Sequence, residues 1–226
     1  MPDPRRLHFL TLLLLASLSS PMSAAAKMED FTLDPVHTRI AFQVSHTGLS
    51  NPIGTFSGTT GTLSFDEDDW TTAQLTVNVA IPTLELGDAN WQKKILDPTF
   101  FNSAKFPEAR FVSSKVERSG EHTAQVMGEL TLHGVTHPVT LAVTLNALKR
   151  HPLTFKRTAG FSATATLSRK DFGMGAWSSL IGDEVRLIIE AEAVRAGKQA
   201  EAKPEPEPAP DSAPTPPTEP DDAASK

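Results

Sequence analysis

A run of alternating residues between Ala73 and Ile81 constrains this fold more than any other feature of the chain. Its odd positions are all apolar, whereas Gln74, Thr76 and Asn78 at even positions are polar. Alternation with a period of two is typical of a β-strand that has one dry face and one wet face. The pattern recurs along most of the chain, so the sequence predicts a sheet that curls around an apolar interior.

About eight segments alternate in this way, and short turns such as His133-Gly134 join most of them. The segments span residues 39–46, 61–65, 73–81, 109–116, 124–132, 135–147, 161–167 and 185–193. Short connections favour an antiparallel meander, and closure into a barrel would remove its exposed edges. The sequence therefore predicts an all-β, eight-stranded antiparallel barrel, with a two-sheet sandwich as the alternative. A barrel of this size is either filled by side chains or holds one small ligand.

A helical period interrupts the strands between Asp88 and Leu96. Asp88 is a predicted N-cap, and apolar residues follow it at helical spacing. Asp97-Pro98 is predicted to start a second short helix that carries Phe100 and Phe101. This insertion has too much apolar surface to lie free in water. We expect it to be either a fixed cap on one end of the barrel or a lid that moves.

The two ends of the chain differ in composition from its middle. Arg5-Arg6, the apolar run 7–18 and the small residues 23–26 match the three parts of a secretory signal peptide, so residues 1–26 are predicted to direct export to the periplasm. Residues 197–226 contain eight prolines and no large apolar residue, which predicts a disordered acidic tail or a tether. Residues 27–196 are the predicted domain.

Composition and motifs exclude several kinds of function. The chain has no Cys, so disulfides, thiolate metal sites and cysteine nucleophiles are excluded. Its net charge is −6 and no basic stripe is evident, so nucleic acid is not an expected partner. Nucleophile-elbow, phosphate-loop and zinc-protease motifs are missing, and no cofactor is expected. His133 and His137 lie four residues apart, but Pro138 argues against a helix there, so no metal is predicted.

Five ordered blocks of the sequence resemble one family, the YceI-like periplasmic proteins, also called polyisoprenoid-binding proteins. The blocks are LDPVHTRIAFQVSH at 33–46, GTFSG at 54–58, FFNSAKFP at 100–107, GELTLHGVTHPV at 128–139 and SRKDFGM at 168–174. The resemblance implies a lipocalin-like barrel with a helical insertion and a secreted location. It also implies a long apolar tunnel that holds an isoprenoid lipid, such as a polyprenyl or quinone-type chain. A homodimer and at most transient membrane contact are further expectations.

Many modest apolar contacts are enough to bind a long hydrocarbon, with a few polar groups at the mouth. The candidates are dry-face residues of the strands, together with apolar residues of the insertion and of a loop at 172–177. They are Phe42, Val44, Phe65, Leu75, Val77, Val79, Ile95, Phe100, Phe101, Val126, Leu130, Leu141, Val143, Phe161, Phe172, Met174, Trp177, Leu187 and Ile189. Ordinary core packing is the alternative for each.

His46 and Arg169 are the candidates for a polar mouth. His46 could contact a lipid head group or be a satisfied core histidine. Arg169 and Lys170 could contact a phosphate, although the pattern favours a solvated turn. Asp34 and His37 are expected to form a structural turn. The predicted function is a carrier, store or sequestering protein for an isoprenoid lipid. The alternatives are a solid barrel that acts as an interaction module and an enzyme on an apolar substrate.

Overall fold

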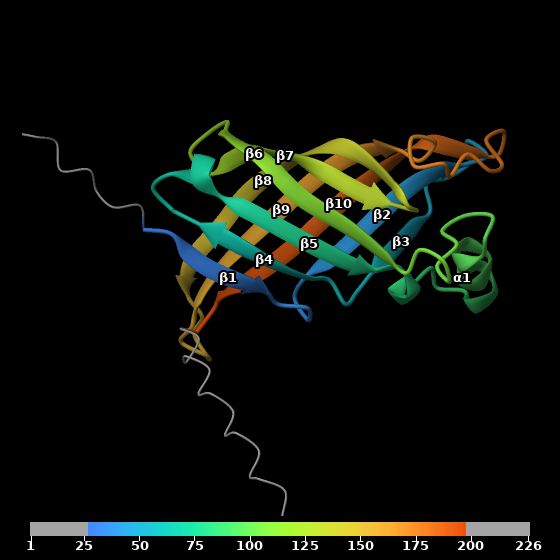
Figure 1. Ribbon diagram of the computed structural model, residues 1–226. Coiled ribbons are helices and arrows are strands. Elements are labelled where there is room, and N and C mark those ends of the chain that lie inside the picture. The colour runs from blue at the N-terminus through green and yellow to red at the C-terminus, as the bar shows by residue number, and fades with distance from the viewer. Residues whose placement is uncertain (1–26, 198–226) are drawn as a thin grey trace, which may run out of the picture. The chain divides into compact units, whose positions relative to one another are not determined.

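The computed structural model describes residues 27–197, and ten strands in this part of the chain form one antiparallel sheet (Figure 1). The strands are β1 (Glu29–Leu33), β2 (Arg39–His46), β3 (Ile53–Phe56), β4 (Thr60–Phe65), β5 (Gln74–Ala80), β6 (Glu108–Arg118), β7 (Thr123–Leu132), β8 (Val135–Arg150), β9 (Arg157–Ser168) and β10 (Ile181–Arg195). The predicted signal peptide and tail lie outside the described residues. No helix within residues 27–197 is long and apolar enough to cross a membrane.

The sheet closes on itself and forms a barrel. Its order is β1-β4-β5-β6-β7-β8-β9-β10, and β1 pairs back onto β10 through Phe31 and Arg195. This ring has eight strands and all its pairs are antiparallel, as the alternating pattern predicted. The two-residue turn at His133 and Gly134, both with positive φ, connects β7 to β8 as expected.

Two of the eight strand positions are each divided into two segments. β1 pairs with β10 at Ala193–Arg195, and β2 continues along the same edge of β10 from Glu190 to Ile181. β4 pairs with β1 in the same way as β3 pairs with β2. The sequence analysis missed β1 and β3, because it recognised only one segment of each divided position.

The free edge of β3 is covered by the segment that follows β5. Thr55 exchanges two backbone hydrogen bonds with Glu85, of 3.0 and 2.9 Å. The hydroxyl of Thr83 donates to the carbonyl oxygen of Ser57 at 2.7 Å. This segment includes the 3₁₀ helix η2 (Ile81–Thr83), and a second 3₁₀ helix, η1 (Trp70–Thr72), precedes β5.

The insertion contains one α-helix, α1 (Ala89–Leu96). Asp88 caps it, and its carboxylate accepts a hydrogen bond of 2.8 Å from the backbone N–H of Trp91, as predicted. The prediction of a second short helix from Pro98 was wrong. The Asp97 side chain accepts from the backbone N–H of Thr99 as an N-cap would, but residues 97–106 form only hydrogen-bonded turns, and the positive φ of Asn102 interrupts the helical path.

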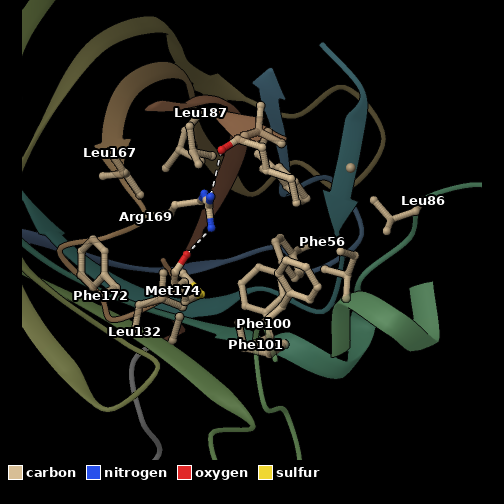
Figure 2. A pocket seen from close by; sticks show the side chains of 18 of the residues that line it. Phe56, Leu86, Phe100, Phe101, Leu132, Leu167, Arg169, Phe172, Met174 and Leu187 are labelled. Atoms are coloured by element: carbon tan, nitrogen blue, oxygen red, sulfur yellow. Dashed lines mark hydrogen bonds between the residues drawn. The ribbon is translucent and has the colours of Figure 1, made fainter. Parts of the chain in front are cut away.

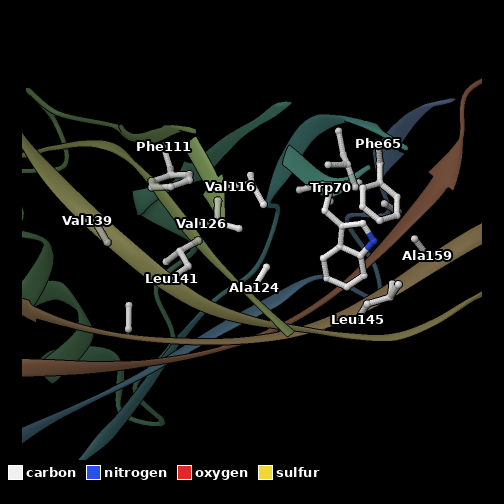
Figure 3. Packing of buried hydrophobic residues seen from close by; sticks show 14 of the residues in the cluster. Phe65, Trp70, Phe111, Val116, Ala124, Val126, Val139, Leu141, Leu145 and Ala159 are labelled. Carbon is white, nitrogen blue, oxygen red and sulfur yellow. The ribbon is translucent and has the colours of Figure 1, made fainter. Parts of the chain in front are cut away.

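The end of the barrel away from α1 is closed by aromatic packing (Figure 3). Phe65 packs edge-on against Trp70 at 5.6 Å and against Phe161 at 6.2 Å between ring centroids. Nearby, the buried carboxylate of Glu29 lies 2.7 Å from Nε of Arg157, as an ion pair rather than an aligned hydrogen bond. A second ion pair of 3.1 Å joins Glu29 to Arg195, so β1 is tied to both β9 and β10.

Candidate ligand-binding site

The barrel encloses two cavities, and the outer one has a volume of about 280 Å³ (Figure 2). The inward faces of β2, β3, β5, β7 and β10 form part of its wall, α1 and the following turn form another part, and the β9–β10 loop completes it. Its lining residues are Ile40, Phe42, Val44, His46, Pro52, Gly54, Phe56, Val79, Ile81, Leu86, Trp91, Lys94, Ile95, Phe100, Phe101, Ala109, Leu130, Leu132, Leu167, Arg169, Phe172, Met174, Trp177, Ile181, Val185 and Leu187.

The inner cavity has a volume of about 180 Å³ and lies among the strands of the closed ring. Its lining residues are Leu33, Thr38, Ile40, Thr59, Leu63, Phe65, Trp70, Ala73, Leu75, Val77, Val79, Ala109, Phe111, Val116, Ala124, Val126, Leu130, Val139, Leu141, Val143, Phe161, Ala163, Leu187, Ile189 and Ala191. Two threonines are the only polar side chains in this lining, which contains no charged residue from the described part of the chain.

The two cavities adjoin, and we call the ring of residues that they share the waist. Five residues line both cavities: Ile40, Val79, Ala109, Leu130 and Leu187. They come from β2, β5, β6, β7 and β10, and Val79 lies opposite Ala109 in the register of β5 and β6. Ala109, from β6, has the smallest side chain of the five.

Every site residue predicted from the sequence lies in the lining of one of these cavities. Eight of the predicted apolar residues and both predicted polar residues line the outer cavity alone, three line both cavities, and eight line the inner cavity alone. Whether they contact a ligand stays a prediction. The sequence analysis missed Ile40 and Leu63 as lining residues, although they lie on the same strand faces as the predicted residues Phe42 and Phe65. It also missed Trp91 and Lys94 on α1, because the face a helix turns inward depends on its docking.

The buried guanidinium of Arg169 organises the loop between β9 and β10. Its Nε donates to the carbonyl oxygen of Gly182 at 2.8 Å, and its two terminal nitrogens donate to Ala176 at 2.8 Å and to Ile181 at 2.9 Å. A fourth bond reaches Met174 (Figure 2). The expectation of a solvated turn was wrong for Arg169, because the loop carbonyls replace water around the guanidinium.

Burial lowers the pKa of Arg169, and the carboxylate of Asp183 acts in the opposite direction. Four of the five guanidinium N–H groups are used by the loop, so the side chain mainly holds the cavity wall in place. His46, at the exposed end of β2, and Lys94, on α1, also line the outer cavity. All three charged or titratable groups of this lining are therefore nitrogen bases.

Three other histidines each contact a neighbouring residue. Nδ1 of His133 lies 3.1 Å from the carbonyl oxygen of Phe172, and the ring of His137 packs edge-on against the ring of Phe172. Asp34 and His37 form the expected turn, in which the carboxylate accepts from the backbone of Val36 at 2.8 Å and lies 2.8 Å from Nδ1 of His37.

Asp34, His37 and Glu192 also bring their ligand atoms within 4.8 Å of one another, in a partly exposed cluster. The local hydrogen bonds of Asp34 account for its position. Exposed acidic groups of this kind are common without a metal.

The closed antiparallel barrel, its apolar interior and the insertion that contains α1 define a class of small β-barrels that enclose a ligand-sized cavity. Within that class, this chain belongs to the YceI-like family, because the YceI-like domain matches residues 31–193. A UPF0312 protein of Pseudomonas savastanoi is 39% identical over 161 residues, which cover 70% of this chain and 82% of the relative. A UPF0312 protein of Pseudomonas fluorescens is 39% identical over 167 residues, covering 73% and 86%.

Solved structures share the fold. BcnA of Burkholderia cenocepacia superposes with a TM-score of 0.65 at 21% identity, covering 71% of this chain and 98% of its own. A polyisoprenoid binding domain from Saccharophagus degradans superposes with a TM-score of 0.56 at 15% identity, covering 74% and 98%.

Proposed function

We propose that this protein binds a long isoprenoid lipid, of the polyprenyl or quinone type, inside the barrel, and that it carries, stores or sequesters that lipid in the periplasm. The observation that carries the proposal is the pair of neighbouring apolar cavities that meet at the waist. Together they fall within the range of about 300–1,000 Å³ that is usual for small-molecule sites. A cavity of this kind disfavours the alternative of a solid barrel that acts only as an interaction module.

The distribution of polar groups supports a ligand with a hydrocarbon tail and a polar head. The inner cavity offers only apolar contacts and two threonines, which suit a hydrocarbon. The outer cavity adds His46, Lys94 and Arg169. Side-chain nitrogen groups that can donate hydrogen bonds in the outer cavity suit a head group that accepts them, such as a quinone carbonyl or a phosphate.

Membership of the YceI-like family and the likeness to a polyisoprenoid binding domain add support. The lining contains no paired nucleophile and base that would favour an enzyme. The test is extraction of the natively purified protein with organic solvent, followed by mass spectrometry. We expect a stoichiometric isoprenoid. An extract without lipid, combined with no uptake of added polyprenol or quinone, would contradict the proposal.

A further inference from the structure

The loop between β8 and β9 is an exposed hairpin tip whose chemistry differs from the rest of this acidic chain. The segment 148–157 reads L-K-R-H-P-L-T-F-K-R and contains no carboxylate, whereas the whole chain has a net charge of −6. Leu153 is 83% exposed and Phe155 is 70% exposed, and both are among the most exposed large apolar side chains of residues 27–197. We call residues 149–156 the hairpin tip.

The exposure of these side chains is built into the backbone of the tip. Nδ1 of His151 accepts hydrogen bonds from the backbone N–H groups of Leu153 and Thr154, at 3.2 and 3.3 Å. Two further backbone bonds of 2.8 Å link His151 to Phe155 and Lys156. The turn is therefore internally hydrogen-bonded, and it leaves Leu153 and Phe155 directed into solvent.

Phe155 has a φ of 58°, a backbone conformation that aromatic residues rarely adopt. The guanidinium of Arg150 donates to its carbonyl oxygen at 3.2 Å and helps to hold this conformation. An unfavourable backbone conformation that keeps an aromatic ring in water is unexpected unless the ring has a partner outside the chain.

The charges beside the two apolar side chains indicate the kind of partner. Lys149, Arg150 and Lys156 are exposed, and none of them pairs with a carboxylate from the described residues 27–197. Arg157 is the exception, because it pairs with Glu29 and Glu67 and belongs to the barrel wall. Apolar side chains at a tip with cations around them match the surface of an anionic bilayer, where acyl chains lie beneath negatively charged head groups.

We propose that the hairpin tip docks the protein on an anionic lipid bilayer, with Leu153 and Phe155 in the head-group region and the three free cations near the lipid phosphates. This inference does not rest on the proposed ligand. An anionic membrane would repel most of the surface of an acidic protein. The basic hairpin tip is the exception, so it also fixes the orientation in which the protein docks.

The exposed apolar residues near the outer cavity offer a weaker docking surface. Trp177 and Leu180 belong to a loop in which Lys170 is followed by Asp171, and Asp183 and Glu184 come after it, so the charges along this segment are mixed rather than basic. The hairpin tip lies at the end of the barrel away from α1 (Figure 1). β8, which leads to it, has 16 residues and spans about 50 Å at roughly 3.3 Å per residue.

The absence of Cys from the sequence gives a direct test. The variants Leu153→Cys and Leu49→Cys place one thiol at each end of the barrel, each at a residue that is more than four-fifths exposed. An environment-sensitive fluorophore on each thiol is followed while the full chain is mixed with vesicles of phosphatidylcholine alone or with phosphatidylglycerol added. The rest of the chain is common to both variants and cannot cause a difference between them.

We expect a blue shift and a rise in intensity for the label at position 153, only with vesicles that contain phosphatidylglycerol, and no change at position 49. In flotation assays, Lys149→Gln and Lys156→Gln should each weaken binding about fivefold, and Leu153→Ser with Phe155→Ser should abolish it. The matched control is Leu49→Ser with Ile53→Ser, which also removes two exposed apolar residues.

Several results would overturn the inference. One is a response at position 49, or none at position 153. Equal binding to both kinds of vesicle would also overturn it, as would unchanged flotation of the hairpin variants. A tip that ignores vesicles but binds polyglutamate would assign this surface to an acidic protein instead. Circular dichroism checks that each variant is folded, and a protein that is empty of isoprenoid can still dock, so this test is separate from that of the bound lipid.

Discussion

The ring of Phe100 packs edge-on against the indole of Trp177, with their centroids 5.9 Å apart. Phe100 belongs to the turn after α1, and Trp177 belongs to the loop between β9 and β10, so this contact joins the two segments that flank the outer cavity. Phe100 is buried although Trp177 is 54% exposed. The exposed indole therefore covers the buried ring.

Removal of this contact should loosen the mouth of the cavity. Aromatic pairs of this geometry contribute about 0.5–1.5 kcal/mol, so Trp177→Ala should raise the rate of lipid exchange by about two- to twelvefold. Stopped-flow fluorescence with a fluorescent prenol measures that rate. Leu180→Ala, at another exposed residue of the same loop, is the control and should leave the rate unchanged. If Trp177→Ala exchanges lipid at the wild-type rate, the contact does not limit access.

Closure of the waist should separate long ligands from short ones. Ala109→Leu adds bulk between the two cavities, and overpacking by such a change costs about 1–3 kcal/mol. We expect binding of a long polyprenol such as solanesol to weaken by about tenfold or more, whereas farnesol, which fits in one cavity, keeps its affinity. Ala142→Leu, on the exposed face of β8, is the control. Equal losses for both prenols would show that the cavities are not used in series.

Filling of the inner cavity should block uptake without unfolding the barrel. Val77→Trp or Val143→Trp places an indole among the residues of that lining. We expect lipid uptake to fall below detection and circular dichroism to keep its β signal. Thr140→Trp, whose side chain lies on the exposed face of β8, should bind normally. Unchanged uptake in both inward variants would mean that the lipid does not enter the inner cavity.

Arg169 should contribute to stability more than to affinity. Arg169→Met leaves the carbonyl oxygens of the β9–β10 loop without their donor, and hydrogen bonds to a charged group contribute about 1.5–3 kcal/mol each. Since water can replace some of these bonds, we expect a loss of about 2–4 kcal/mol in the free energy of unfolding, measured with urea. Lys170→Met, at the exposed neighbour, should cost little. A loss just as small for Arg169→Met would refute this role.

The Asp34 turn should respond to pH in a defined window. The hydrogen bond that His37 donates to the carboxylate of Asp34 raises the pKa of His37, and the same bond lowers the pKa of Asp34. The stabilisation from His37 is therefore present below its ordinary pKa and is lost as the pH rises through the raised value. That from Asp34 is present above its ordinary pKa and is lost as the pH falls through the lowered value.

NMR titration of His37 checks this pair. In Asp34→Asn, the pKa of His37 should return toward its ordinary value of about 6.5. Glu192→Gln should lower it by less, because Glu192 acts on His37 only through its charge and more weakly than Asp34. An unchanged titration in Asp34→Asn would place the cause of the shift elsewhere.

The barrel could be predicted because its strands obey a simple parity. The inward residues Val77 and Leu130 follow directly from alternation, and both line a cavity. Parity failed at β1 and β3 for physical reasons. In β1 the alternating set includes Glu29, a buried charge that is stable only because Arg157 and Arg195 pair with it.

In β3 the inward position is Gly54, which reads as a turn in the sequence. A Cβ atom at this position would lie 2.3 Å from the ring of Phe42, so the glycine leaves space for that ring. Neither contact could be predicted from the sequence, because each partner is distant along the chain or defined only by packing. The loop carbonyls around Arg169 were hidden for the same reason.

The divided strand positions have a consequence for how such a barrel can change. The interruptions at Asp34–Thr38 and at Ser57–Thr59 lie side by side, since Thr32 pairs with Thr62 and Ile40 pairs with Phe56. Both halves of the wall are attached to the single long strand β10. Insertions at these two joints would alter the bore of the outer half while the inner half keeps its register. The same barrel can thus come to accept ligands of different width in its outer half while its inner half stays unchanged.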